Sequence, residues 1–320
     1  RNTQQTIQTA YSRFLEQKRL NPRQGQKLMI AVVARTLGNI LTDEDGARLG
    51  EEHVCVVEAG TGTGKTVAYA LAAIPTAQAQ DKKLVISTAT VALQEQIMLK
   101  DLPDLRQHSG LVFNAVLAKG RGRYACLYKL DYLLAHGSTP GTQALYPDER
   151  DALLPDQTLR VFQTMLEALS ESTWDGDRDN WSQAVDDEAW QRLTTDHSQC
   201  TGRRCAYVTQ CPFFRARENL VDADVIVANH DLVLADLALG GGVILPAPEQ
   251  AIFVFDEGHH LPDKALQHFA VNTRIQSSVR WLQSTTKTLS VLAKTLHGVH
   301  AVQSALNRWS DIEKKLLQAH

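Results

Sequence analysis

The chain contains 320 residues, 43% of them hydrophobic and 22% charged, and its formal net charge is −3. This is the composition of a soluble globular protein of roughly two domains. This composition excludes a strong overall positive charge, so any path for nucleic acid must be a local stripe of basic residues. Residues 1–20 are polar and helix-patterned, unlike a signal peptide. No run reaches the roughly 18 apolar residues that span a bilayer, so we expect a cytoplasmic protein with no membrane partner.

The first part of the chain alternates between helical and strand-like patterns. A helical pattern over residues 5–40 is broken at Asn21–Pro22. An apolar run then leads into a Gly-rich turn, as a buried parallel strand does before a helix. The predicted strands are 53–58, 83–89 and 112–117, and the predicted helices are 64–80 and 91–101. This order predicts an α/β fold with a doubly wound parallel sheet and right-handed crossovers.

The alternation then stops and later resumes. Residues 120–219 hold four of the five cysteines and an acidic, Trp-containing segment, and we interpret them as an insertion. Strand-like runs at 224–228 and 251–256 continue the interrupted domain. Beyond Leu261 apolar residues recur at spacings of three and four, which predicts the packing face of a long helix or a helix pair broken at Gly298. The residues of this face are Leu292, Leu296, Val299, Val302, Leu306, Trp309, Ile312 and Leu316.

The clearest chemical motif is the segment 58–66, which reads Glu-Ala-Gly-Thr-Gly-Thr-Gly-Lys-Thr. It fits a Walker A loop with Ala59 in place of the first glycine. Glycines there turn main-chain N–H groups toward phosphates, and the following helix adds its positive N-terminal end. Lys65 is expected to reach the β- and γ-phosphates of ATP, and the Thr66 hydroxyl to bind Mg²⁺. The predicted nucleotide-binding residues of the loop are Gly60, Thr61, Gly62, Thr63, Gly64, Lys65 and Thr66.

An apolar strand that ends in two carboxylates supplies the partner of this loop. Residues 253–260 read Phe-Val-Phe-Asp-Glu-Gly-His-His. We expect Asp256 to hold Mg²⁺ through water, and Glu257 to orient or deprotonate the attacking water. Lys65, Asp256 and Glu257 are therefore the candidate catalytic residues. The alternative interpretations are that segment 58–66 is a Gly-rich turn without function and that segment 253–260 is an ordinary exit from a strand into a loop.

The motifs together resemble those of superfamily 2 helicases of the XPD-like DinG family. The Asp-Glu-Gly-His sequence at 256–259 resembles the DEAH box, with Gly where Ala is usual, and this resemblance adds His259 to the nucleotide site. Gln26 matches the glutamine that reads adenine in such helicases. The segment 87–96 resembles motif Ia, which touches the backbone of single-stranded DNA in the family. Asn229–His230 resembles the Asn-His that precedes motif II.

The resemblance implies an ATP-dependent 5′–3′ DNA helicase of replication and repair that works in the nucleoid. Its expected substrate is single-stranded DNA in forked or 5′-tailed duplexes or R-loops, and its expected state is a monomer. A RecA-like motor domain would be interrupted by an iron–sulfur insertion and followed by a helical arch. The expected bounds are 1–119 and 220–264 for the motor domain, 120–219 for the cluster domain and 265–320 for the arch.

The second motor domain of such helicases has no counterpart after Leu261. That domain supplies the arginines that stabilise charge on the transferred phosphoryl group. We therefore expect these residues alone to bind nucleotide but to turn it over poorly. The chain begins with Arg1 rather than Met, which fits a trimmed or incomplete product.

The five cysteines are an odd number in a long chain, which argues against a secreted disulfide framework. Thiolates suit both iron–sulfur clusters and zinc, so the residues alone leave both open, although the absence of close Cys-x2-Cys pairs counts against zinc. The resemblance implies a [4Fe–4S] cluster held by Cys126, Cys200, Cys205 and Cys211. Cys55 is expected to be a small buried apolar residue of its strand.

Basic and aromatic residues are interleaved around these cysteines, a combination that suits single strands. The alternative is a solvated face with ordinary core aromatics. We expect the acidic segment 171–188 to lie away from the DNA path, because it would repel DNA. The candidate DNA contacts are Thr88, Thr90, Arg121, Arg123 and Tyr124.

Two other functions remain open at this point. One is a nucleotide- and ssDNA-binding module without motor activity, which a natural end near His320 would favour. The other is a zinc-containing P-loop ATPase that acts on RNA or protein, which metal analysis would distinguish.

Overall fold

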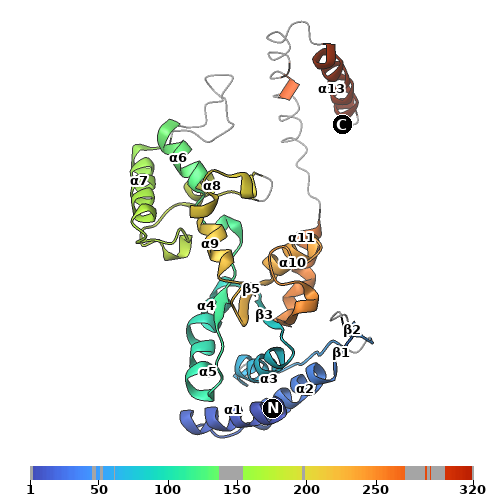
Figure 1. The fold of residues 1–320 in the computed structure, drawn as a ribbon. Helices are drawn as coiled ribbons and strands as arrows, with labels where there is room; N and C mark the ends of the chain where they lie inside the picture. The colour runs from blue at the N-terminus through green and yellow to red at the C-terminus, as the bar shows by residue number, and fades with distance from the viewer. Residues whose placement is uncertain are drawn as a thin grey trace. The chain divides into compact units, whose positions relative to one another are not determined.

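The computed structural model describes residues 3–44, 48–50, 53–60, 62–136, 154–196, 199–270, 285–286, 289 and 300–318. The chain divides into two compact units (Figure 1). The first comprises residues 1–140 and 154–269, and the second comprises 141–153 and 270–320. Among the described helices, none is both long and apolar enough to cross a membrane.

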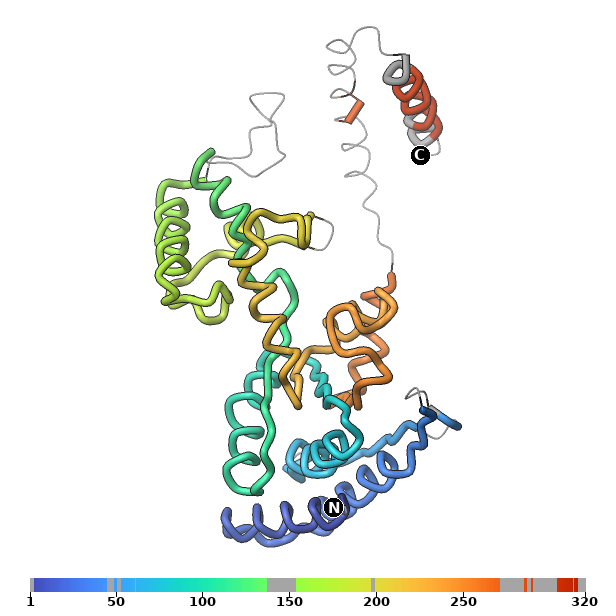
Figure 2. The backbone as a smooth tube through the Cα atoms, in the orientation of Figure 1, coloured from blue at the N-terminus to red at the C-terminus, as the bar shows by residue number. Residues whose placement is uncertain are grey.

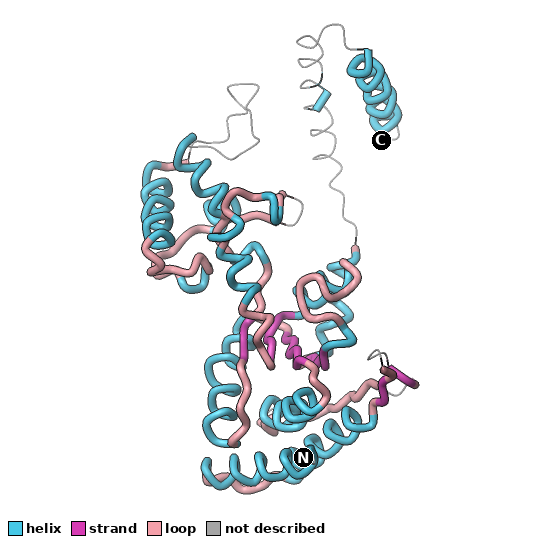
Figure 3. Tube along the Cα trace, viewed as in Figure 1, coloured by secondary structure: helices cyan, strands magenta, loops and turns pink. Residues whose placement is uncertain are grey.

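A four-stranded parallel sheet lies at the centre of the first unit (Figure 3). Its order is β4 (Ala115–Leu117), β5 (Val225–Asn229), β3 (Lys83–Thr88) and β6 (Ala251–Phe255). Every neighbouring pair is parallel. The predicted α/β fold with a parallel sheet is confirmed. Because parallel strands end at the same edge, the segments after β3, β5 and β6 meet there.

Helices cover both faces of the sheet, so its strands are apolar on both sides. On β3, Leu84 and Ile86 point into a core with α1 (Thr3–Lys18), α2 (Gln24–Asn39) and α3 (Lys65–Ala79), which lie together in Figure 2. Val85 points to the other face and packs with α10 (His230–Ala238). The predicted break at Asn21–Pro22 is present between α1 and α2.

The strand predicted at residues 53–58 is wrong. Cys55 and Val57 pack against the core, whereas the side chains of Val54 and Val56 are 74% and 91% exposed. The alternation of a strand is thus present, but within the described residues no neighbouring strand pairs with this segment, and β6 pairs only with β3. A strand needs the hydrogen bonds of a neighbour, which the local pattern does not reveal. Cys55 is half-buried rather than buried.

Smaller differences occur in the segments that precede the insertion. The predicted helix 91–101 is α4 (Val91–Gln96) followed by a π-helical turn (Ile97–Asp101), and the chain continues as α5 (Leu102–Ser109). The predicted strand 112–117 is shortened to β4. A short antiparallel hairpin of β1 (Leu41–Thr42) and β2 (Arg48–Leu49) was not predicted.

The insertion is helical in its described part and has its own hydrophobic core. Phe162, Met165, Leu130 and Leu133 are fully buried in it, and Trp190 packs beside them. Its helices are α6 (Leu127–His136), α7 (Asp156–Ser170), α8 (Asp187–Leu193) and α9 (Pro212–Glu218). The expected absence of strand–helix alternation holds for the residues of 120–219 that the structure describes.

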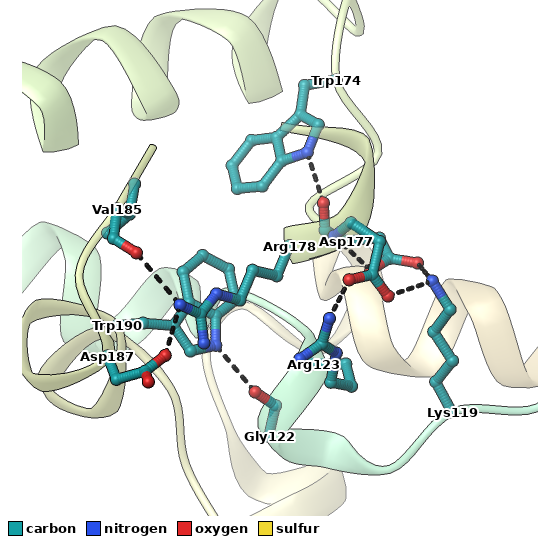
Figure 4. Close-up of polar contacts among 10 residues, drawn as sticks. Lys119, Gly122, Arg123, Trp174, Asp177, Arg178, Val185, Asp187 and Trp190 are labelled. Carbon is teal, nitrogen blue, oxygen red and sulfur yellow. Dashed lines mark hydrogen bonds and ion pairs between the residues drawn. The ribbon is translucent and has the colours of Figure 1, made fainter. Parts of the chain in front are cut away.

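An ionic network, in which Asp177 is the most buried member, joins the insertion to the exit of β4 (Figure 4). The Lys119 ammonium pairs with Asp177 and lies 2.7 Å from an oxygen of Asp179, which also pairs with Arg123. Trp190 donates from its indole nitrogen to the carbonyl of Gly122 at 2.7 Å. The acidic segment therefore contacts Lys119 and Arg123, and the second of these is a candidate DNA contact.

The second unit contains one long described helix, α13 (His300–Gln318). The Trp309 indole donates to the Thr286 hydroxyl at 3.0 Å. Leu306 and Trp309 of the predicted packing face are half-buried, whereas Ile312 is 52% exposed. The residues Leu292, Leu296, Gly298 and Val299 lie outside the described part. Helix α11 (Leu261–Phe269) belongs to the first unit.

Candidate active site

The Gly-rich loop precedes α3 at the carboxyl edge of the sheet. Lys65 is the first residue of α3, and the Thr63 hydroxyl donates to the Gly60 carbonyl at 2.7 Å, which closes the turn. Gly62 and Gly64 have φ angles of +77° and +76°, a left-handed conformation that favours glycine. Thr61 lies outside the described residues. The loop thus has the backbone shape that a phosphate cradle requires.

Gln26 contacts this loop directly. Its side-chain nitrogen donates to the Gly64 carbonyl at 3.3 Å, and its oxygen accepts from the Tyr11 hydroxyl at 3.1 Å. The guanidinium of Arg23 donates to the Gly62 carbonyl. Arg23 and Tyr11 were not predicted from the sequence. The only sequence signal for Arg23 is its place beside Gln26, and Tyr11 carried none.

Replacing Gly64 by Ala is expected to weaken nucleotide binding by about tenfold or more, because an alanine there is strained and crowded. Its Cβ would lie 2.6 Å from the Gln26 amide nitrogen, in a left-handed backbone conformation that costs roughly 1–2 kcal/mol for a non-glycine residue. Titration with a fluorescent ATP analogue measures the affinity. Gly25→Ala is the matched control, since a Cβ at Gly25 meets nothing within 4 Å. Equal affinities for the two variants would contradict this role of Gly64.

Lys65 and Glu257 form an ion pair across the site. Their Nζ and Oε1 atoms are 2.7 Å apart, although the residues are 192 positions apart in sequence. The hydrogen bond from Lys65 lowers the pKa of Glu257 and raises the pKa of Lys65. The structure therefore brings the predicted phosphate-binding lysine and the predicted general base into contact, and both side chains remain partly open to solvent.

Asp256 occupies the end of β6 beneath this pair. Burial raises its pKa, and the Tyr69 hydroxyl donates to it at 3.2 Å. The amide of Asp256 donates to the Ser87 carbonyl at 2.8 Å. Glu257, the next residue, has a φ of +55°, which is uncommon for a residue with a side chain. This turn aims the two adjacent carboxylates into the same space.

Two further side chains border the site. His259 lies 3.4 Å from Glu257 between Nδ1 and Oε2, with its ring largely exposed. Asp101 on the π-helical turn was missed by the sequence analysis. Burial raises its pKa, and hydrogen bonds from Gln96 and Thr66 oppose that shift. Asp101 thus lies near Thr66, the residue predicted to bind Mg²⁺, and π-helical turns often occur at functional sites.

The candidate DNA contacts differ in accessibility. Thr90 is exposed and its hydroxyl caps α4, whereas Thr88 is completely buried. Tyr124 is 7% exposed and packs edge-on against Phe213, with 5.9 Å between the ring centroids. Arg123 is half-buried in the pair with Asp179 described above. Arg121 is half-buried and lies outside that network.

The four clustered cysteines lie near one another as free thiols. Burial raises the pKa values of Cys126 and Cys211, and nearby thiols add to both shifts: Cys211 and Cys205 for the first, Cys200 and Cys205 for the second. Arg121 donates to the sulfur of Cys200 at 2.9 Å. Among the described residues, no group of three or more His, Cys, Asp or Glu side chains is placed to hold a metal ion.

Comparison with known proteins gives two family matches and several relatives. Residues 44–133 match the DEAD/DEAH box helicase family, and residues 186–277 match DEAD_2. The ATP-dependent DNA helicase DinG of Photobacterium profundum is 41% identical over 273 residues, which cover 85% of this chain and 38% of that protein. That of Escherichia coli K12 is 41% identical over 257 residues, covering 79% and 34%. The chain is homologous to the DinG helicases.

The matches include both halves of the candidate site. The region similar to DEAD/DEAH box helicases contains the Gly-rich loop, and the DEAD_2 region contains Asp256 and Glu257 together with three of the four clustered cysteines. The chain spans about a third of the length of the DinG relatives that it matches. A solved structure called XPD_Helicase is 15% identical with a TM-score of 0.44, over 93% of this chain and 48% of the other.

Proposed function

We propose that this chain forms part of an ATP-dependent DNA helicase of the DinG type that moves 5′ to 3′ on single-stranded DNA. The observation that carries the proposal is the contact of Lys65 with Glu257 at the carboxyl edge of a parallel sheet. A phosphate-binding lysine and a water-activating carboxylate are brought together there by segments from opposite ends of the domain. If the Gly-rich turn and the strand exit had no function, no chemical requirement would bring Lys65 and Glu257 into contact.

The site residues divide the work of ATP hydrolysis. The γ-phosphate attracts the Lys65 ammonium more strongly than a single carboxylate does, so ATP would separate Lys65 from Glu257. Glu257 is then free to orient the attacking water. Asp256 and the Thr66 hydroxyl would hold Mg²⁺, which neutralises charge on the phosphates. Gln26 and His259 border the same space and are proposed to contact the nucleotide.

We propose that the remaining steps need a second motor domain, whose arginines stabilise the transferring phosphoryl group. Residues 1–320 would then comprise the first motor domain (1–119 and 220–264), the cluster domain (120–219) and the start of the arch (265–320). Alone they would bind nucleotide and turn it over poorly. The proposed setting is DNA repair and replication in the cytoplasm, at the nucleoid, with the helicase acting as a monomer.

The four cysteines are proposed to hold a [4Fe–4S] cluster, which would join the segments that carry them. A single zinc ion needs all its ligands to converge at about 2.3 Å. The sequence has no close Cys-x2-Cys pair, which counts against zinc, whereas a cluster takes its thiolates at separate irons. The N–H groups of Arg121 and Gly202 that donate to Cys200 also fit a cluster ligand, because such bonds stabilise sulfur that carries negative charge.

For DNA, we propose Thr90 and Arg121 as the first contacts to test, because Thr90 is exposed and Arg121 lies outside the ionic network of Lys119 with the acidic segment. Arg121 lies over the Phe213 ring at 4.1 Å, so a phosphate would meet a cation already held in place. Arg123 would have to leave Asp179 to bind a phosphate. Thr88 and Tyr124 would contact DNA only after local rearrangement.

The decisive experiment is unwinding by the full-length protein on duplexes with a 5′ or a 3′ single-stranded tail. Unwinding of only the 5′-tailed duplex with ATP is the expected result. ATP hydrolysis without unwinding of either duplex would leave a P-loop ATPase, and binding of both ligands without hydrolysis would leave a binding module. Robust DNA-stimulated hydrolysis by residues 1–320 alone would contradict the need for a second domain.

A further inference from the structure

His230 is a fully buried side chain close to the two carboxylates. It begins α10, directly after β5, and none of its surface is exposed. Its Nδ1 lies 2.7 Å from the Ser87 hydroxyl oxygen. In the part of the chain that the structure describes, no hydrogen-bond partner satisfies its other ring nitrogen, Nε2. An unsatisfied buried nitrogen is rare in folded proteins and calls for an explanation.

Ser87 connects this histidine to two functional segments. It lies on β3 opposite Phe255 of β6, and its carbonyl accepts from the amide of Asp256 at 2.8 Å. Ser87 also leads through Thr88 to Thr90, the exposed candidate for DNA contact. Ser87 thus contacts Asp256, at the end of β6, through its main chain and His230 through its hydroxyl. It also precedes the proposed DNA-binding segment.

The turn that ATP is expected to disturb lies close to the His230 ring: the ring centroids of His230 and Phe255 are 6.0 Å apart, and Asp256 and Glu257 directly follow Phe255. Burial lowers the pKa of His230, and the backbone of Glu257 and Asp256 acts in the opposite direction, so both residues lie near the ring. Glu257 has a left-handed backbone conformation, and its carboxylate pairs with Lys65. Such a conformation persists only while its surroundings enforce it, and a phosphate that takes Lys65 would remove part of that restraint.

We propose that His230 is a positioning residue that couples the nucleotide site to the DNA-binding segment after β3. When ATP releases Glu257, the shifted turn supplies a carbonyl to Nε2, and the ring passes the change through Nδ1 to Ser87. The inference rests on the proposed function, because it requires that nucleotide and DNA bind to the same protein. It adds a specific route by which each would affect the other.

The test measures coupling between the two ligands in the full-length protein. The affinity for a non-hydrolysable ATP analogue is determined with and without a saturating single-stranded oligonucleotide, and the ratio of the two is the coupling factor. Allosteric factors are typically about 5–150-fold. His230→Asn keeps a polar atom near Nδ1 and removes Nε2, so the factor should fall to about 1. His230→Gln places an amide nearer to Nε2 and should recover part of it.

Ser87→Ala removes the hydroxyl that contacts His230, so it breaks the same connection on the β3 side. It should lower the coupling factor as His230→Asn does, and the double variant should show no further loss, as expected for two residues in one network. Ser109→Ala is the matched control, since Ser109 is also buried and its hydroxyl accepts from the amide of Leu111. If His230→Asn does not fold, Ser87→Ala decides the question alone.

Two outcomes would overturn the inference, and they lead to different conclusions about the helicase proposal. A coupling factor that stays at the wild-type value in folded His230→Asn and Ser87→Ala proteins would remove His230 from the route while the helicase proposal stands. A wild-type protein whose nucleotide affinity does not respond to DNA at all would count against the proposed function, and against this route with it.

Discussion

Replacing Lys65 by Ala is expected to reduce the kcat for ATP hydrolysis by the full-length protein by roughly 10²–10³, the effect of removing a preorganised charge from a developing negative centre. The ammonium lies at the first turn of α3, where the loop directs main-chain N–H groups at the same phosphates. Alanine leaves the loop backbone in place but removes this ammonium group. Binding of single-stranded DNA should persist, because Lys65 is not among the proposed DNA contacts.

Lys264→Ala is the matched control for this experiment. Lys264 pairs with Asp231 at 2.6 Å, and its side chain is 25% exposed, compared with 26% for Lys65. Both variants therefore lose one lysine–carboxylate pair in which the lysine has a similar exposure, which isolates the effect of position. Steady-state ATPase assays with saturating DNA give kcat for each. A Lys65→Ala protein as active as the Lys264→Ala protein would show that the Gly-rich loop is not the phosphate site.

Replacing Cys205 by Ser is expected to abolish the iron content and the unwinding activity of anaerobically purified full-length protein. A [4Fe–4S] cluster brings about four irons and four sulfides per chain, and a hydroxyl is a poor substitute for a thiolate at iron. Tyr207, which lies between the two short turns near Cys205 and Cys211, packs against the core of the insertion and donates its hydroxyl to Asp131 at 2.7 Å, so the variant protein should still fold. The visible spectrum, iron and acid-labile sulfide measure the loss.

Cys55→Ser is the control for the cluster experiment, because Cys55 packs against the core formed by the sheet with α1, α2 and α3 rather than beside the other thiols. Its protein should remain brown with full iron. A wild-type protein that is colourless and contains zinc would replace the cluster with a zinc site. No metal even after reconstitution would leave only the Gly-rich loop and the Asp-Glu-Gly-His motif. A cluster-free Cys205→Ser protein that unwinds normally would show that the cluster is dispensable.

The chemistry of the site could be predicted from short segments of sequence. The loop before Lys65 needs glycines at positions with positive φ, and the strand before Asp256 needs an apolar run, so each leaves a local pattern. The break at Asn21–Pro22 is equally local, because proline cannot continue a helix interior. The parallel sheet followed from the alternation of such patterns, since parallel neighbours need long crossovers. These features can be predicted from the sequence without knowledge of any tertiary contact.

Contacts between distant segments were decided only by the tertiary structure. Nothing local shows that Lys65 meets Glu257, that Gln26 binds Gly64, or that the acidic segment holds Lys119. The segment 53–58 has the pattern of a strand, but strand formation depends on a hydrogen-bonding neighbour elsewhere in the chain. The burial of Tyr124 and the orphan nitrogen of His230 likewise depend on packing. A sequence pattern records the preferences of each segment, whereas the partners that satisfy charges, hydrogen bonds and sheet edges are set by how the segments assemble.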